Sequence, residues 1–158
     1  MMQKTPLFVL AFSMTLWTTA GCSAPERERA TGSPGTLSPC PNTPNCVSTQ
    51  AADARHTLPP LPYAGTRQES FDHLVRILRG MKRCSIVSST GLYIHAECRS
   101  AVFGFVDDVE FLFDDDERQI HFRSAARSGY YDFGVNRRRM KDISEGYLAS
   151  IESSSPEK

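Results

Sequence analysis

The sequence has little of several features that usually announce a function. Its 18 Lys and Arg residues balance 18 Asp and Glu residues, so the formal net charge is zero. Such a balance predicts no general affinity for nucleic acid or for an anionic membrane, so any such affinity must come from local clustering of charge. There is one tryptophan, Trp17, and the aromatic residues of the predicted strands mostly point inward, which excludes a stacking platform for single-stranded nucleic acid. We therefore expect no nucleic-acid partner.

Motifs of common cofactor-dependent enzymes are also missing. The sequence contains no phosphate-binding loop, dinucleotide fingerprint, zincin helix or nucleophile elbow. The four histidines form no close pair, so we predict neither a metal site nor a cofactor. No apolar run reaches the roughly 20 residues that a membrane-spanning helix needs. The run from Leu7 to Trp17 follows Lys4 and precedes small residues, which is typical of a secretory signal.

The stretch Thr19-Ala20-Gly21-Cys22 resembles a bacterial lipobox, in which the cysteine is lipidated and becomes the first mature residue. We predict a lipoprotein signal peptide over 1–21 and a lipid anchor on Cys22 that holds the protein on a membrane. The alternative is an ordinary signal peptide cleaved near Ala20. Ser23 is not the Asp that commonly retains lipoproteins in the inner membrane. We therefore expect a cell-envelope protein on the outer membrane, facing the periplasm.

The remaining chain divides by composition. Residues 22–39 have almost nothing to bury and predict a flexible tether. Residues 40–152 carry the apolar content and suffice for one modest core. Residues 153–158 are predicted to be a disordered tail.

Four cysteines remain after Cys22, and they allow three pairings. Export permits disulfides. The short, proline-containing loop between Cys40 and Cys46 favours a local bridge. Strand register, described below, places Cys84 opposite Cys98. A catalytic cysteine needs a lone thiol beside a histidine, so thiols that come in pairs argue against it.

Hydrophobic periodicity predicts two helices. A capping box from Thr66 to Glu69 starts the first helix, and Gly80 ends it. The second helix spans residues 135–151, with Asp132 placed to cap its first turn. Its predicted inner stripe consists of Asn136, Met140, Ile143, Tyr147 and Ile151.

Alternation between the helices predicts four strands. The first two form a hairpin that turns at 90–92. The third carries five apolar residues inward, and the fourth carries two; the seven are Phe103, Phe105, Val109, Phe111, Phe113, Ile120 and Phe122. A four-residue loop at 114–117 pairs Phe111 with Ile120 and Glu110 with His121. The prediction is a single small α+β domain, a four-stranded antiparallel sheet with two helices packed on one face.

The same register turns Asp107 and Ser124 inward together. A buried carboxylate needs a cation or several hydrogen-bond donors. The run from Arg137 to Arg139 lies at the positive end of the second helix, where cations are disfavoured and an acidic partner or bound anion is expected nearby.

Three stretches, CPNTPNCVS, FVDDVEF and FRSAARSGYYDFGVNRRR, resemble the bacterial family catalogued as domain of unknown function 1499. Its members show a CP...NCVS start and an RSxSRxGxxDxGxNRxR-like end, in which Ala126 here replaces the second serine. The family brings no accepted activity. The resemblance implies that its motif positions are occupied here by Arg123, Ser124, Arg127, Asp132, Gly134, Asn136, Arg137 and Arg139.

Three hypotheses for this motif remain open. In the first, Arg127 pairs with Asp132 or Asp107 and fastens the last helix to the sheet. In the second, arginines and Asn136 bind an anionic small molecule, cell-wall fragment, lipid headgroup or envelope protein. In the third, Asp107 or Asp132 serves a hydrolase as base beside an arginine clamp. We expect a structural or binding module rather than an enzyme, with an anion or partner site drawn from Arg123, Arg127, Asp132, Asn136, Arg137 and Arg139.

Overall fold

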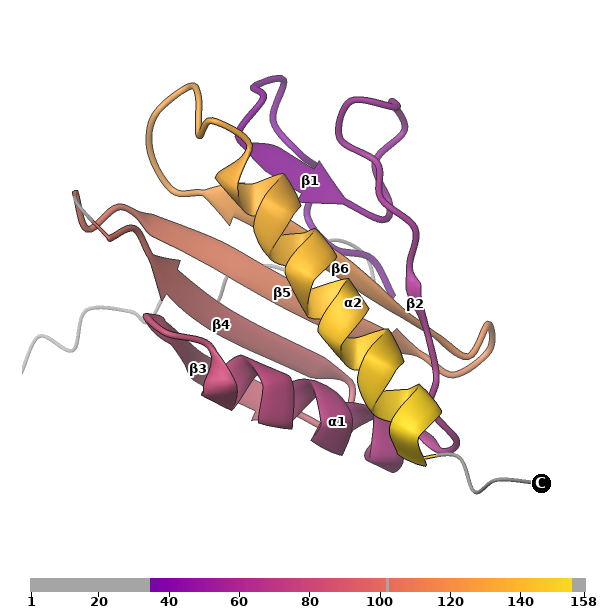
Figure 1. Ribbon diagram of the computed structural model, residues 1–158. Coiled ribbons are helices and arrows are strands. Elements are labelled where there is room, and N and C mark those ends of the chain that lie inside the picture. Colours follow the sequence, from indigo (N-terminus) through magenta and orange to yellow (C-terminus); the bar gives the residue numbers. More distant parts are fainter. Residues whose placement is uncertain (1–34, 102, 155–158) are drawn as a thin grey trace, which may run out of the picture.

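The computed structural model describes residues 35–101 and 103–154 (Figure 1). The predicted signal peptide, the lipidation site Cys22 and most of the predicted tether lie outside the described residues. No helix within these ranges is both long and apolar enough to cross a membrane.

The described chain forms one antiparallel sheet covered by two helices. The sheet order is β1-β6-β5-β4-β3, and the short β2 also pairs with β6. Figure 1 shows both helices on the same face of the sheet. The strands are β1 (Cys46–Ser48), β2 (Leu61–Pro62), β3 (Cys84–Thr90), β4 (Tyr93–Arg99), β5 (Val106–Asp114) and β6 (Gln119–Ala126); the helices are α1 (Arg67–Gly80) and α2 (Val135–Ser154).

The predicted four-stranded sheet is wrong, because the sheet has six strands; the α+β class is retained. The two additional strands, β1 and β2, are three and two residues long, which is too short to show alternation in the sequence. Both are recognised as strands by their pairing with β6, where Cys46 lies opposite Ala125 and Leu61 lies opposite Ile120.

The core lies between the sheet and the helices. Ile94, Val109 and Phe111 contribute fully buried side chains from the sheet. Helix α1 begins with the predicted capping box, in which Glu69 N donates to Thr66 Oγ1 at 3.2 Å and Thr66 N donates to Glu69 Oε2 at 2.7 Å. The inner stripe predicted for α2 is confirmed, because four of its five members are fully or almost fully buried: Asn136, Met140, Ile143 and Tyr147.

The register of the first hairpin agrees with the prediction. Cys84 lies opposite Cys98, and a disulfide joins them with a Cα–Cα distance of 4.1 Å. The second predicted disulfide, between Cys40 and Cys46, is also present.

The predicted register of the second hairpin is wrong by two residues. Phe111 lies opposite Phe122 rather than Ile120, and Glu110 lies opposite Arg123 rather than His121. The loop begins one residue later than predicted because the backbone N–H groups of two following residues donate to Asp114 Oδ1, while Arg118 adopts a left-handed φ of 52°. A shift of two residues keeps every side chain on its predicted face.

Phe103 and Phe105 do not point into the core, so this part of the prediction is also wrong. They are 77% and 55% exposed. Ser100 N donates to Phe105 O, and Phe105 N donates to Ser100 Oγ, which closes a loop around Gly104 with φ 65°. Strand β5 therefore starts only at Val106, and the alternation that precedes it belongs to a loop.

Strand β3 forms an edge of the sheet. Its pairing with β4 is irregular between Ile86 and Ser88, which leaves Val87 outside the ladder and half exposed. Such a bulge increases the local twist of the strand.

Candidate functional site

A buried ion pair joins the start of β5 to α2. Arg139 Nη2 lies 2.6 Å from Asp107 Oδ2, and both side chains are less than 10% exposed. Arg139 Nη1 also donates to Asn136 Oδ1 at 2.9 Å and to Ser124 Oγ at 3.3 Å. The cation that the inward carboxylate requires thus comes from α2, and Asp107 and Ser124 are both buried as predicted.

Asn136 connects three parts of the chain. Its Oδ1 accepts from Ser124 Oγ at 2.5 Å, and its Nδ2 donates to Asp132 Oδ2 and to Asn45 O. Asp132 accepts from the backbone N–H groups of Gly134 and Asn136, so it caps the first turn of α2 as predicted. Asn45 Nδ2 in turn donates to Gly129 O at 2.6 Å. The β6–α2 connection is therefore fixed at both ends.

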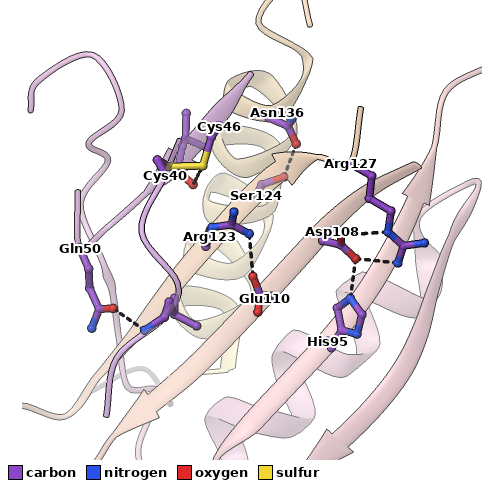
Figure 2. Close-up of polar contacts among 12 residues, drawn as sticks. Cys40, Cys46, Gln50, His95, Asp108, Glu110, Arg123, Ser124, Arg127 and Asn136 are labelled. Atoms are coloured by element: carbon purple, nitrogen blue, oxygen red, sulfur yellow. Dashed lines mark hydrogen bonds and ion pairs between the residues drawn. A yellow bond between two sulfur atoms is a disulfide. The ribbon is translucent and has the colours of Figure 1, made fainter. Parts of the chain in front are cut away.

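A second polar cluster lies on the face of the sheet away from the helices (Figure 2). Arg127 binds Asp108 in a bidentate manner, with Nε and Nη2 at 2.9 and 2.7 Å, and Nη2 also contacts Glu97. His95 Nε2 lies 2.8 Å from the same Asp108 carboxylate. The hydrogen bonds with Asp108 raise the pKa of Arg127, so its guanidinium remains charged.

The partner predicted for Arg127, Asp132 or Asp107, is wrong. Arg127 follows the outward-facing side chains of β6, and Asp108 is an outward-facing carboxylate near the start of β5. Asp107 points to the helix face, where Arg139 is its partner.

Arg123 belongs to the same outer face. Its Nη1 donates to Glu110 Oε2 at 2.9 Å, and Tyr93 donates its hydroxyl proton to Glu110 Oε1 at 2.7 Å. Burial, with the nearby Glu110 carboxylate, raises the pKa of Tyr93. Arg123 Nε is buried and has no hydrogen-bond partner within residues 35–101 and 103–154.

The remaining motif arginine, Arg137, and its neighbour Arg138 contact backbone carbonyls. Arg137 Nη1 donates to Thr57 O at 3.2 Å, and Nη2 contacts Arg55 O. Arg138 Nη1 donates to Phe133 O at 2.8 Å. Every arginine of the motif thus has an acceptor within the protein, and the predicted anion-binding role of this set stays a prediction.

The sequence did not predict a pocket of about 360 Å³ that opens between the end of α1, the paired ends of β3 and β4, and the first turns of α2. We call it the basic pocket, because five cationic residues and a single carboxylate line it: Lys82, Arg83, Arg99, Arg138, Arg139 and Asp142. The Cys84–Cys98 disulfide also lines it. Its cations come from three separate segments, and the local signals were the Arg137–Arg139 run and the Lys82-Arg83 pair directly before a cysteine.

Asp114, Glu117 and His121 offer metal-ligand atoms that lie within 4.8 Å of one another. His121 Nδ1 contacts Thr49 Oγ1 at 3.1 Å, and Glu117 is exposed. Acidic groups gather in this way at many exposed turns, so the arrangement by itself assigns no metal.

Together these features define a small disulfide-linked α+β domain in which arginines of one sequence motif brace both faces of an antiparallel sheet. The chain belongs to the family described as "Protein of unknown function (DUF1499)", whose model matches residues 36–146. This confirms the family that the motifs resemble. No curated protein matches the sequence.

Proposed function

We propose that the protein is an envelope lipoprotein, anchored through Cys22, whose domain binds an anionic ligand without catalysing a reaction. The basic pocket is the observation that carries this proposal. Its ligand is a phosphate or carboxylate group presented by a lipid headgroup, a cell-wall fragment or an envelope protein.

The charge distribution in the basic pocket supports this role. Within the described parts of the chain, the side chains of Lys82 and Arg83 form no ion pair or hydrogen bond. Arg138 is exposed and uses Nη1 for Phe133 O. Guanidinium groups bind phosphate and carboxylate with two parallel hydrogen bonds, so these donors suit an oxyanion. Arg139 is paired with Asp107 and Arg99 with Glu97, so Lys82, Arg83 and Arg138 supply the positive charge that attracts an anion.

The scaffold holds the cations in place. Arg99 N donates to Arg83 O at 2.9 Å, and the adjacent disulfide joins the same two strands. Arg139 anchors α2 through Asp107, which holds the neighbouring Arg138 in the wall of the pocket. In this proposal the buried arginines of the motif are braces, and the exposed cations contact the ligand.

The geometry favours binding over hydrolysis. A general base must reach the substrate and solvent. Asp107 is 5% exposed and paired with Arg139, and Asp132 accepts three hydrogen bonds from its own loop and helix. Both carboxylates therefore already serve the fold.

A titration with inorganic phosphate and glycerol phosphate tests the pocket. Backbone NMR shifts of Arg83, Arg99 and Arg138 are expected to move in a saturable manner. The variant Lys82→Gln/Arg83→Gln should lose this response. The control Arg76→Gln/Lys141→Gln removes two exposed cations outside the pocket and should retain it. Equal responses in both variants, or none in the unchanged protein, would refute the site.

The anchor is tested separately in cells. A fatty-acid label should appear on the unchanged protein and be lost from the Cys22→Ser variant, and mass spectrometry should place the mature N-terminus at Cys22. Fractionation should then find the labelled protein in the outer membrane. Absence of label from the unchanged protein, or its retention in the variant, would contradict the lipoprotein assignment.

A further inference from the structure

Five exposed aromatic residues gather at one end of the sheet. We call them the aromatic rim: Phe103, Phe105, Tyr130, Tyr131 and Phe133, each more than half exposed. Single exposed apolar residues are ordinary on soluble proteins, whereas a contiguous group of large ones marks an interaction surface.

The rim is formed by two neighbouring connections. Arg127 N donates to Val106 O at 3.0 Å, so the β6–α2 connection leaves the sheet beside the place where β5 enters it. Figure 1 shows the β4–β5 and β6–α2 connections projecting from the same end of the sheet. Ring centroids are 5.7 Å apart for Phe103 and Phe105 and 5.1 Å apart for Tyr131 and Phe133.

The rings are held outward by the fold. Phe133 adopts a left-handed backbone conformation with φ 55°, which is unfavourable for a bulky side chain. Its carbonyl is bound by Arg138, and Gly129 O is bound by Asn45. Phe133 is thus held exposed in an unfavourable backbone conformation, and polar contacts fix the loop that carries it. Such an arrangement lowers the ordering cost of binding through this surface.

The rim borders the basic pocket. Ser100 and Ala101, which line the pocket, belong to the connection that carries Phe103 and Phe105. Val135, also in the pocket wall, follows Phe133 by two residues. The rim and the basic pocket therefore share two chain segments at one end of the sheet.

We propose that the aromatic rim inserts into the interfacial layer of a lipid bilayer while the basic pocket takes the phosphate of an anionic lipid headgroup. This inference rests on the proposed function and names its ligand class. Phe and Tyr partition into the interfacial layer, and neighbouring Lys and Arg side chains are attracted to anionic lipids. The rings project from loop tips rather than line a groove, which suits insertion into a fluid layer.

The position of the predicted anchor points to the same occupant. Only residues 23–34 separate Cys22 from the first described residue, Gly35. Twelve residues span at most about 45 Å when fully extended, so a lipid on Cys22 keeps the domain next to a bilayer. The second contact then determines which end of the domain faces the membrane.

Vesicle co-sedimentation of the mature chain from residue 22 tests the proposal, with Cys22→Ser so that no acyl chain contributes. The chain should sediment with vesicles containing phosphatidylglycerol and much less with pure phosphatidylcholine. Phe103→Ala/Phe133→Ala should weaken partitioning by about tenfold or more, because insertion scales with buried apolar area. The matched control is Val87→Ala/Leu92→Ala, which removes two half-exposed apolar residues away from the rim and should stay within about twofold.

Each other outcome has a defined meaning. Saturable phosphate binding without vesicle binding overturns the membrane inference and leaves the proposed function standing. If the unchanged protein binds neither phosphate nor vesicles, both the proposed function and the membrane inference are overturned. Vesicle binding that survives Phe103→Ala/Phe133→Ala overturns the role of the rim. Concentration-dependent dimerisation that this variant abolishes, in a chain that does not bind vesicles, assigns the rim to a second copy and overturns the inference.

Discussion

Asp107 and Arg139 are 32 residues apart in the sequence and meet at 2.6 Å where β5 begins beneath α2. Both side chains are almost inaccessible to solvent. The pair therefore determines how the last helix sits on the sheet, and Arg139 also satisfies Asn136 and Ser124 within the same buried cluster.

Replacement of Arg139 should destabilise the domain strongly. Arg139→Met leaves Asp107 buried without a cation, and we expect the free energy of unfolding to fall by about 3 to 5 kcal/mol. Arg138→Met, on the exposed neighbour, should change it by no more than about 0.5 kcal/mol. Urea unfolding with intact disulfides measures both. Adding Asp107→Asn to Arg139→Met should recover part of the lost free energy of unfolding. A double variant that is less stable than Arg139→Met would contradict the ion-pair explanation.

Arg127 should matter less, because its side chain is 31% exposed, although its main partner Asp108 is buried. We expect Arg127→Ala to lower the free energy of unfolding by about 1 to 3 kcal/mol. Arg127→Lys should recover only part of it, since an ammonium group cannot form the bidentate contact. Arg99→Ala is the control: its pair with Glu97 is longer, at 3.4 Å, and exposed, so the change should stay within about 0.5 kcal/mol. If Arg127→Ala leaves the free energy of unfolding unchanged, buried Asp108 does not need the guanidinium of Arg127.

The two disulfides should contribute unequally. Cys84–Cys98 spans 14 residues and Cys40–Cys46 spans 6. Loop-closure entropy then predicts losses of about 3 kcal/mol for Cys84→Ser/Cys98→Ser and about 2 kcal/mol for Cys40→Ser/Cys46→Ser. Thermal unfolding of the two variants measures the order. Cys84→Ser/Cys98→Ser should also weaken phosphate binding, because the disulfide that it removes lines the basic pocket. Unchanged phosphate affinity would show that the binding site does not depend on this disulfide.

The capping box predicts one component of acid sensitivity. Hydrogen bonds from Thr66, first from its backbone N–H and then from its hydroxyl, lower the pKa of Glu69 below the ordinary 4.5. A carboxyl whose folded pKa is depressed stabilises the fold above its unfolded pKa, and that stabilisation is lost as the pH falls through the folded pKa. Glu69→Gln should therefore reduce the loss of stability below pH 4.5.

Glu145→Gln is the matched control, since Glu145 is exposed on α2. Stability measured from neutral to acidic pH should follow that of the unchanged protein in the control and flatten only in Glu69→Gln. If stability falls with pH in the same way in all three proteins, the Glu69 carboxyl does not contribute to the acid sensitivity of the fold.

The sequence predicted which face of the sheet each strand side chain takes, but it did not predict the register between β5 and β6. Val109, Phe111 and Phe122 face the core as alternation predicts. Two registers that differ by two residues place the same side chains inward, so the pattern cannot choose between them. The choice came from Asp114, which accepts hydrogen bonds from the turn and shifts it by one residue. As a result Glu110, which was predicted to lie opposite His121, lies opposite Arg123 and pairs with it.

The motif residues were found from the sequence, but most of their partners were not. Asp132 caps α2 as its spacing predicted. Arg127 was expected to pair with Asp132 or Asp107 but binds Asp108, while Asp107 pairs with Arg139, because adjacent Asp107 and Asp108 point to opposite faces of β5. The basic pocket was missed because folding brings its cations together from distant segments. Two members of the aromatic rim, Phe103 and Phe105, were wrongly predicted to be core because the alternation of the sequence begins before the true start of β5.

The bulge in β3 bears on how the protein tolerates crowding. A long, regular edge strand offers unpaired backbone groups to any identical neighbour. The irregularity between Ile86 and Ser88 interrupts the pairing pattern in the middle of this edge, and a serine-rich strand adds little apolar attraction. Copies of the domain that come close together are then less able to pair sheet edge to sheet edge.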